Sequence, residues 1–295
     1  MLVMAEISTR KGTIQMVFVS GFATRRFGRE THAIYLLDEQ HCIETDFFDV
    51  GAMLEKGINL PEFRSHLLEN PKTVPYLASE LTPLVRYPSK IICLGLNYAD
   101  HVAEMGRKGA NFPTLFAKFS DSMTGPYSDI ELPTNSQQVD YEAELAIIIG
   151  RTATKVPVEA AANYIAGFTI SNDVSMRDYQ WRTSQFLQGK IFDASTPLGP
   201  VLVNAVDVDF GHDLAITSLV NGQIRQASRT SQMIFGINET ISYISQITTL
   251  RPGDVVLTGT PRGVGAAMDP PTFLKSGDIV TCEIEGLGSI SNLFV

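Results

Sequence analysis

The sequence is poor in cysteine, in long apolar runs and in clustered basic residues, and each shortage excludes a class of protein. Its three cysteines, Cys42, Cys93 and Cys282, are too few and too far apart for a disulfide scaffold or a zinc site. The most apolar stretch, at 145–149, is far shorter than the roughly 20 residues that cross a bilayer. We therefore expect no membrane partner, and so few cysteines fit a reducing compartment.

The charge balance is acidic, with 23 Lys and Arg against 32 Asp and Glu, a formal net charge of −9. Without a basic cluster, nucleic acid is not expected as a partner. The first residues, MLVMAEISTRKG, lack the apolar core of a signal peptide, so we expect a cytoplasmic protein. A hydrophobic content of 44% excludes a disordered chain and leaves a globular one.

The texture of the sequence changes near residue 88, which suggests an N-terminal domain over 1–88 and a second domain over 89–295. The first part predicts strands over 15–20 and 33–37 and a helix over 60–69, whereas 46–57 has no clear period. The stretch 71–88 contains several prolines and is typical of a connector. We assign no function to residues 1–88.

From residue 89 onward, short β-prone runs alternate with glycines. The clearest helix is expected over 231–247, where isoleucines recur at helical spacing, at Ile234, Ile237, Ile241 and Ile244. Six or more strands with two or three helices predict a β-rich α+β fold. A regular alternation of strand and helix is absent, which argues against Rossmann and TIM-barrel folds.

The strongest chemical signal is the run DYEAELAIIIG at 140–150. On a strand, Glu142 and Glu144 point to the same face, about 6.5–7 Å apart. The apolar residues that follow indicate a strand buried on both sides, where two carboxylates repel each other unless they share a proton or a cation. The alternative is that both glutamates lie at a solvated strand end.

A third acid, Asp173, ends the next β-prone run, at 164–173. Three carboxylates suit Mg²⁺, Mn²⁺ or Ca²⁺, because these hard ions prefer oxygen ligands. In an alternative interpretation, Asp173 caps a helix and pairs with Arg177 four residues later. That role does not exclude metal binding.

A histidine and a glutamate in the run NYADHVAE form a possible catalytic pair. If Asn97 caps a short helix with Asp100 at its third position, His101 and Glu104 lie on one helix face. A carboxylate beside an imidazole orients it as a base that can take a proton from water. The alternative is an ordinary surface pair.

Two lysines and a glycine-rich turn complete the candidates. Lys118 and Lys190 lie in apolar contexts, where an ammonium can stabilise an enolate or anchor a carboxylate, unless each simply extends to solvent. The turn TGTPRGVG at 258–265 can offer backbone N–H groups and a hydroxyl to an anion. It matches no nucleotide-binding motif.

Taken in this order, the motifs at 89–295 resemble the fumarylacetoacetate hydrolase superfamily, which includes acylpyruvate hydrolases and 2-hydroxyhepta-2,4-diene-1,7-dioate isomerases. The resemblance implies a mixed β-sandwich roll behind a small N-terminal α/β domain, a homodimer, and a divalent ion, either Mg²⁺ or Mn²⁺, with Ca²⁺ also compatible. It also implies the roles of individual residues: metal ligands Glu142, Glu144 and Asp173, a water-activating pair His101 and Glu104, the enolate-stabilising Lys190, and the substrate contacts Arg177, Gln180 and Thr260, to which we add Lys118.

This resemblance predicts divalent-metal-dependent hydrolysis of a C–C bond in a small 1,3-diketo acid such as an acylpyruvate. The departing fragment would leave as an enolate, which the cation and Lys190 neutralise, while His101 activates water. Decarboxylation of an oxaloacetate-type acid and isomerisation of a 2-hydroxydienoate are alternatives at the same site. A non-catalytic metal-binding structural protein is the alternative of a different class.

Overall fold

The structure is a computed structural model that describes residues 3–9, 12–106 and 111–295. The N-terminal part contains β1 (Val3–Thr9), β2 (Gly12–Phe18), β3 (Gly21–Phe27), β4 (Glu30–Leu36), β5 (His41–Glu44), α1 (Val50–Glu55), α2 (Leu60–Glu69) and β6 (Thr73–Pro75). The middle of the chain forms β7 (Ile91–Gly95), α3 (Ala99–Glu104), β8 (Thr114–Lys118), β9 (Met123–Thr124), β10 (Val139–Asp140), β11 (Ala143–Ile149), β12 (Ile165–Asn172), β13 (Ser175–Met176), α4 (Arg177–Gln180) and β14 (Thr196–Asn204). The last part forms β15 (Ala215–Val220), β16 (Gln223–Arg229), α5 (Ile237–Ile247), β17 (Val255–Leu257), β18 (Ile279–Ile284) and β19 (Gly288–Leu293).

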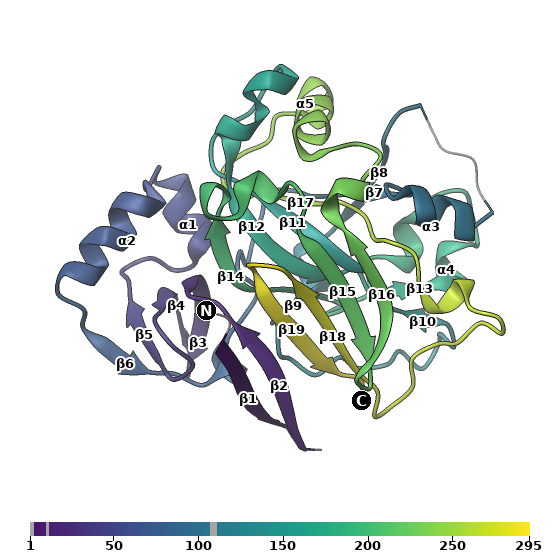
Figure 1. Ribbon diagram of the computed structural model, residues 1–295, viewed down its shortest axis with the longest axis horizontal. Helices are drawn as coiled ribbons and strands as arrows, with labels where there is room; N and C mark the ends of the chain where they lie inside the picture. Colours follow the sequence, from purple (N-terminus) through teal and green to yellow (C-terminus); the bar gives the residue numbers. More distant parts are fainter. Residues whose placement is uncertain (1–2, 10–11, 107–110) are drawn as a thin grey trace.

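Two sheets form the body of the molecule, which confirms the expected β-rich α+β fold (Figure 1). The larger sheet has eleven strands, in the order β6-β5-β4-β3-β14-β12-β11-β17-β7-β8, with β9 beside β14. The smaller sheet has the order β16-β15-β18-β19. It packs on the larger sheet, since β15 contacts β11, β18 contacts β12 and β19 contacts β14.

Strand β11 is buried on both faces, as its apolar run predicts. Leu145, Ile147 and Ile149 join the core between the two sheets. Ala146 and Ile148 point the other way, into a core shared with helix α1. Side chains alternate along a strand, so β11 contributes to both cores at once. Because both faces of β11 are packed, the strand fixes the position of the two glutamates, Glu144 within it and Glu142 just before it.

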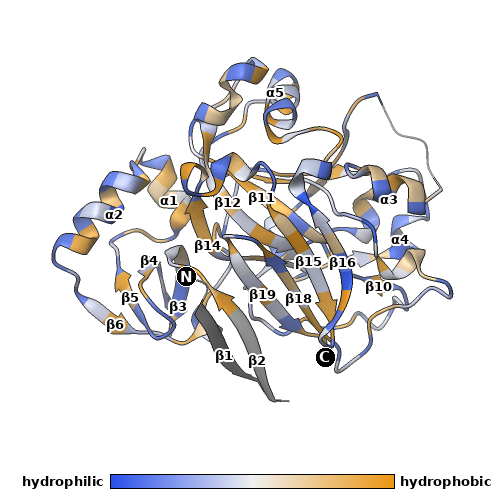
Figure 2. Ribbon diagram, viewed as in Figure 1, coloured by the Kyte–Doolittle hydropathy of each residue, from blue (hydrophilic) through white to orange (hydrophobic). Residues whose placement is uncertain are grey.

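The N-terminal strands continue the large sheet. β3 pairs with β14 through Phe22 and Leu202, and β4, β5 and β6 follow it. The predicted helix over 60–69 is confirmed by α2, which begins where Asn59 accepts a hydrogen bond from the Glu62 N–H. This helix is largely hydrophilic, whereas β14 is mostly hydrophobic (Figure 2). The division at residue 88 stays a prediction, but backbone pairing crosses it.

Three local predictions differ from the structure. The aperiodic segment 46–57 contains α1, which the Asp49 side chain caps by accepting from the Ala52 N–H. The helix expected from residue 231 begins only at Ile237, because the Ile234 N–H donates to the Asn97 carbonyl instead of to a helical turn. The connector at 71–88 includes β6 and a short 3₁₀ turn, Ala78–Glu80.

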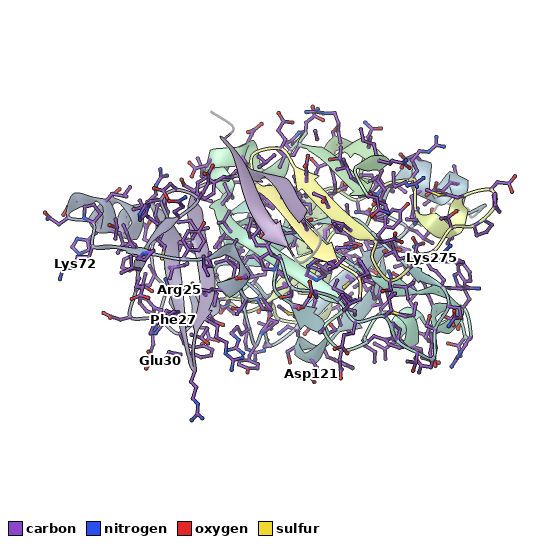
Figure 3. All side chains as sticks on the ribbon, turned by 90° about the horizontal axis from the view of Figure 1, so that it is seen from below. Arg25, Phe27, Glu30, Lys72, Asp121 and Lys275 are labelled. Atoms are coloured by element: carbon purple, nitrogen blue, oxygen red, sulfur yellow. The ribbon has the colours of Figure 1, made fainter. Side chains whose placement is uncertain are left out.

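Polar side chains lie on the surface, and the three cysteines lie in the interior. Lys72 lies near one end of the long axis and Lys275 in the other half of the molecule, and side chains with nitrogen or oxygen tips project all along the outline (Figure 3). All three cysteines are buried and unpaired. Within the described ranges, no helix combines the length and apolar character that a bilayer span requires.

Candidate active site

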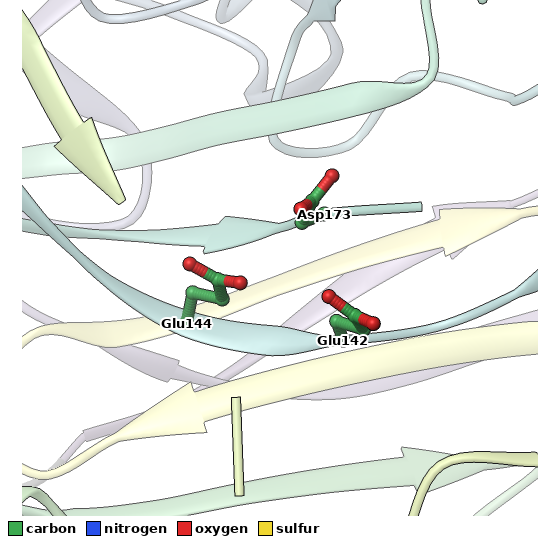
Figure 4. A group of neighbouring side chains, drawn as sticks. All are labelled: Glu142, Glu144 and Asp173. Atoms are coloured by element: carbon green, nitrogen blue, oxygen red, sulfur yellow. The ribbon is translucent and has the colours of Figure 1, made fainter. Parts of the chain in front are cut away.

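Three acids meet where β11 begins and β12 ends. The two strands are antiparallel, with Ala143 opposite Asn172, so Asp173 lies beside Glu142 and its N–H donates to the Glu142 carbonyl at 2.9 Å. One carboxylate oxygen of each of Glu142, Glu144 and Asp173 lies within 4.8 Å of the others (Figure 4). All three side chains are buried, so the alternative of a solvated strand end is wrong.

Two buried lysines neutralise part of this acid triad, which comprises Glu142, Glu144 and Asp173. Lys190 Nζ lies 2.7 Å from Glu142 Oε2 and 2.8 Å from Asp173 Oδ2. Lys118 Nζ lies 2.7 Å from Asp173 Oδ1 and also donates to the Lys190 carbonyl. Neither ammonium extends to solvent, because both lysines are only 2% exposed. The alternative of solvent-extended lysines is therefore wrong.

The three acids differ in their preferred protonation state. Burial works to raise the pKa of Glu142, but Lys190 and Arg177 outweigh it and lower that pKa to about 2. Glu144 forms no ion pair with any described residue, and its Oε2 accepts from the Gly259 N–H at 2.8 Å. Burial, then the negative charges of Asp173 and Glu142, raise the pKa of Glu144 well above its ordinary value. Among the described residues, no positively charged side chain pairs with Glu144, unlike the other two acids of the triad.

These observations fit a divalent cation. Oxygen ligands lie 2.0–2.6 Å from Mg²⁺ or Ca²⁺, so two ligands on opposite sides of one ion are about 4–5 Å apart. The 4.8 Å limit on the triad's ligand atoms agrees with one shared ion. Such an ion would supply the positive charge that Glu144 lacks. The donor set, three carboxylates, is the kind that hard cations prefer.

Arg177 is held on the opposite side of Glu142. Its Nη1 lies 2.7 Å from Glu142 Oε1 and also donates to Gln180 Oε1 at 2.9 Å. Its Nε and Nη2 lie 2.9 and 2.8 Å from Asp140 Oδ2. The alternative in which Asp173 caps a helix and pairs with Arg177 is therefore wrong, because Met176 is the N-cap residue of α4 and Arg177 pairs with Asp140 and Glu142.

Helix α3 brings His101 and Glu104 together as predicted. His101 Nδ1 lies 2.8 Å from Glu104 Oε1, and both Glu104 oxygens lie 3.0 Å from the Gly263 N–H. An ionised carboxylate can only accept, so the shared proton is on Nδ1, and in the neutral imidazole this leaves Nε2 with the lone pair. His101 is buried and lines the pocket beside the triad, so it is not an ordinary surface histidine.

The predicted helix cap at Asn97 is wrong, because Tyr98 occupies the N-cap position. The Asn97 amide instead connects three segments of the chain. Its Nδ2 donates to the Phe235 and Thr258 carbonyls at 3.1 and 2.8 Å, and its Oδ1 accepts from the Phe235 N–H at 2.9 Å. The side chain is 1% exposed, so these bonds fix the entry to α3 from within the core.

A pocket beside the triad collects most of the predicted residues. Its cavity volume is about 30 Å³. The lining combines polar and apolar side chains: Leu94, Gly95, Leu96, His101, Met105, Phe116, Glu142, Arg177, Gln180, Trp181, Phe186, Lys190 and Thr260. The hydroxyl of Thr260 is already used, since it donates to the Ala143 carbonyl and accepts from Gln226. Lys118 is not in this lining, and its position behind Asp173 favours a role in holding that acid over the predicted substrate contact.

The glycine-rich turn does bind anions, and they are carboxylates of the chain itself. Its N–H groups donate to three acids: Gly259 to Glu144, Gly263 to Glu104, and Gly265 to Asp140. Two buried residues of this network, Asp140 and Gln226, were given no role by the sequence. Asp140 stands in the motif itself, but Gln226 lies in a polar hairpin that carries no recognisable signal.

Similarity to known proteins extends over most of the chain. The family model described as fumarylacetoacetate (FAA) hydrolase C-terminal matches residues 90–295. A mitochondrial oxaloacetate tautomerase of Rattus norvegicus is 49% identical over 216 residues, which cover 73% of this chain and 69% of that protein.

Solved structures give the same picture. The fumarylacetoacetate hydrolase of the psychrophilic Exiguobacterium antarcticum is 31% identical, with a TM-score of 0.81 over 94% of this chain and 99% of its own. A fumarylpyruvate hydrolase of Pseudomonas aeruginosa, in complex with Mn²⁺ and pyruvate, is 32% identical, with a TM-score of 0.64 over 77% of this chain and 92% of its own.

Proposed function

We propose that this chain, which belongs to the fumarylacetoacetate hydrolase family, is a Mg²⁺- or Mn²⁺-dependent enzyme that interconverts the enol and keto forms of oxaloacetate or a similarly compact 2-oxo acid. The observation that carries the proposal is one pocket lined by Glu142 of the triad, the Lys190 ammonium and the His101 imidazole. The similarity to an oxaloacetate tautomerase supports the substrate.

Glu142, Glu144 and Asp173 would hold the ion. When bound, such an ion supplies positive charge next to the 2-oxo acid and makes its C3 protons more acidic. His101 Nε2 takes one proton from C3, and the C2 oxygen receives a proton in exchange, so no atom or electron is lost. The Lys190 ammonium lies where it can stabilise negative charge that develops on the C2 oxygen.

The remaining residues orient these groups. Glu104 keeps the Nδ1 proton of His101 in place, so that Nε2 remains the basic nitrogen. Arg177 and Gln180 line the same pocket and are proposed to contact substrate oxygens. Thr260 lines this pocket too and is proposed to contact the substrate. Its hydroxyl also donates to the Ala143 carbonyl and accepts from the Gln226 amide.

Hydrolysis of an acylpyruvate is the second candidate, and the His101–Glu104 pair favours it. Hydrolysis needs an activated water, and an imidazole backed by a carboxylate can provide one. The similarity to a fumarylpyruvate hydrolase supports the same chemistry. Tautomerisation needs a proton-transferring group but no activated water, so it makes fewer demands on the site than hydrolysis does. Oxaloacetate decarboxylation and 2-hydroxydienoate isomerisation remain alternatives, and cytoplasmic location and a homodimer remain predictions.

A direct comparison of substrates tests the proposal. Purified protein is assayed with Mg²⁺ and with Mn²⁺ on enol-oxaloacetate, followed by loss of the ultraviolet absorbance of the enol, and in parallel on acylpyruvates and on release of CO₂ from oxaloacetate. We expect tautomerisation to be fastest and a chelator to abolish it. Tautomerisation that persists after chelation, or faster acylpyruvate cleavage, would overturn the proposal.

A further inference from the structure

Gln226 is a fully buried amide that reaches from one sheet into the site of the other. It belongs to β16, the edge strand of the four-stranded sheet, and has 0% exposure. Its Oε1 accepts from the Ala143 N–H at 3.0 Å. Its Nε2 donates to Thr260 Oγ1 at 2.7 Å and to the Pro261 carbonyl at 2.8 Å. Both amide protons and the carbonyl oxygen are therefore used.

These partners belong to the two halves of the candidate site. Ala143 lies between the two glutamates of the triad, Glu142 and Glu144. Thr260 and Pro261 belong to the glycine-rich turn, and Gly263, two residues on, donates to both oxygens of Glu104. Gln226 thus spans the short gap between the backbone that carries the triad and the backbone that holds the partner of His101.

The turn also rests directly on the backbone of β16. Gly263 has a φ of +105°, and a Cβ at this position would lie 2.0 Å from the Arg225 carbonyl oxygen. No other residue fits there, because both the dihedral angle and the backbone contact require glycine. The turn therefore packs against the backbone of Arg225, and the side chain of the next residue, Gln226, donates hydrogen bonds to it.

We propose that Gln226 is a positioning residue that fixes the His101–Glu104 pair relative to the acid triad. The amide does this through Ala143 on one side and through Thr260 and Pro261 on the other, without reaching the pocket. An apolar side chain of the same length would fill the space but leave the Ala143 N–H and the Pro261 carbonyl without this partner. The turn would then lose its register against β11, and Glu104 would move with Gly263.

The test compares Gln226→Met with a matched variant, Asn292→Leu. Asn292 is also a buried amide of the four-stranded sheet, 1% exposed, and it donates to the Gly125 and Ser128 carbonyls at 3.3 and 2.8 Å. Both variants remove an amide that binds main-chain carbonyls, so both should lower the melting temperature. Only Gln226→Met should disturb the site. If it does not fold, Gln226→Glu takes its place, since it keeps the acceptor for Ala143 and lacks the amide donors to the turn.

Two measurements decide the outcome. In the activity assay, which rests on the proposed function, we expect Gln226→Met to lower kcat by about 10- to 100-fold with KM within about threefold, because misplacement of a catalytic group costs rate more than binding. Asn292→Leu should keep both constants.

The second measurement does not depend on turnover. ¹⁵N-edited NMR of labelled histidines follows the hydrogen-bonded Nδ1 proton of His101, assigned by its loss in His101→Asn. We expect this signal to disappear or shift in Gln226→Met and to persist in Asn292→Leu. If the wild-type protein shows no turnover, the proposed function is wrong, and the NMR signal of His101 alone tests the positioning role. An unchanged His101 signal in Gln226→Met, or equal changes in both variants, would overturn the positioning role.

Discussion

The ammonium of Lys190 lies 2.7 Å from Glu142 Oε2, and both groups are buried. The same ammonium contacts Asp173, so one lysine holds two of the three acids that we propose as metal ligands. Without a cation in the triad, this lysine supplies positive charge that keeps the buried Glu142 carboxylate ionised. Lys190 therefore contributes both to folding and to the proposed chemistry.

We expect Lys190→Met to destabilise the metal-free protein strongly and the Mn²⁺-loaded protein less. Removing one partner of a buried ion pair costs about 3–5 kcal/mol, because the remaining charges are left uncompensated. Mn²⁺ would compensate the same acids. Thermal unfolding with and without saturating Mn²⁺ measures the difference.

Lys90→Met is the control, because Lys90 lies 2.8 Å from the buried Asp254 on the far end of β17. Its loss should destabilise the protein equally with and without Mn²⁺. The same recovery by Mn²⁺ in both variants would show that the ion does not act at Lys190.

Glu144→Gln and Asp173→Asn should have opposite effects on the metal-free protein. Glu144 has no cationic partner among the described residues, and the negative charges of Asp173 and Glu142 repel its ionised form. A neutral glutamine should therefore leave the free energy of unfolding unchanged or raise it. Asp173 accepts from two lysines, so its replacement should destabilise. Denaturant unfolding compares them, and both variants should bind Mn²⁺ more weakly than wild type. A strongly destabilised Glu144→Gln would contradict the charge pattern.

The affinity for Mn²⁺ should rise with pH. The raised pKa of Glu144 means that the metal-free acid keeps its proton to a higher pH, and the ion must displace that proton. Below that pKa, the Kd should fall by up to about tenfold per pH unit, and above it the Kd should level off. Glu142, with a pKa of about 2, is already ionised and adds no slope near neutrality. Titration calorimetry over a pH series checks this, and Glu144→Gln should flatten the dependence.

His101→Ala should lower kcat for tautomerisation by about 10²–10⁴-fold, the usual contribution of a general acid–base group, while Mn²⁺ affinity stays constant. The matched control is His41→Ala, because His41 and Asp38 form a similar 3.0 Å pair on the exposed surface. His41→Ala should have no effect. A His101→Ala variant that still releases CO₂ from oxaloacetate at the wild-type rate would identify decarboxylation as the native reaction.

The sequence predicted what local patterns control. The apolar run after Glu144 identified a strand buried on both faces, and the β period placed both glutamates on one side. The helix expected over 60–69 agrees with the bounds of α2. The acids converge because β11 and β12 are neighbours in the sheet, as strands that follow one another in the chain usually are.

The sequence did not predict what distant contacts control. The capping pattern at Asn97 is a local rule, but the amide bonds residues 138 and 161 positions away. Gln226 likewise meets Ala143 from 83 positions away. Such contacts depend on how two sheets pack, and neither periodicity nor residue type records that packing.

Strand β11 offers no freedom to slide. A shift of one residue would exchange its two inner faces, sending Ile148 into the space of its neighbours between the sheets and turning both glutamates away from Asp173. The pocket's outer wall, with Leu96, Trp181 and Phe186, stands on separate segments of the chain. Replacing these wall residues would therefore change the shape of the pocket while β11 keeps the glutamates beside Asp173.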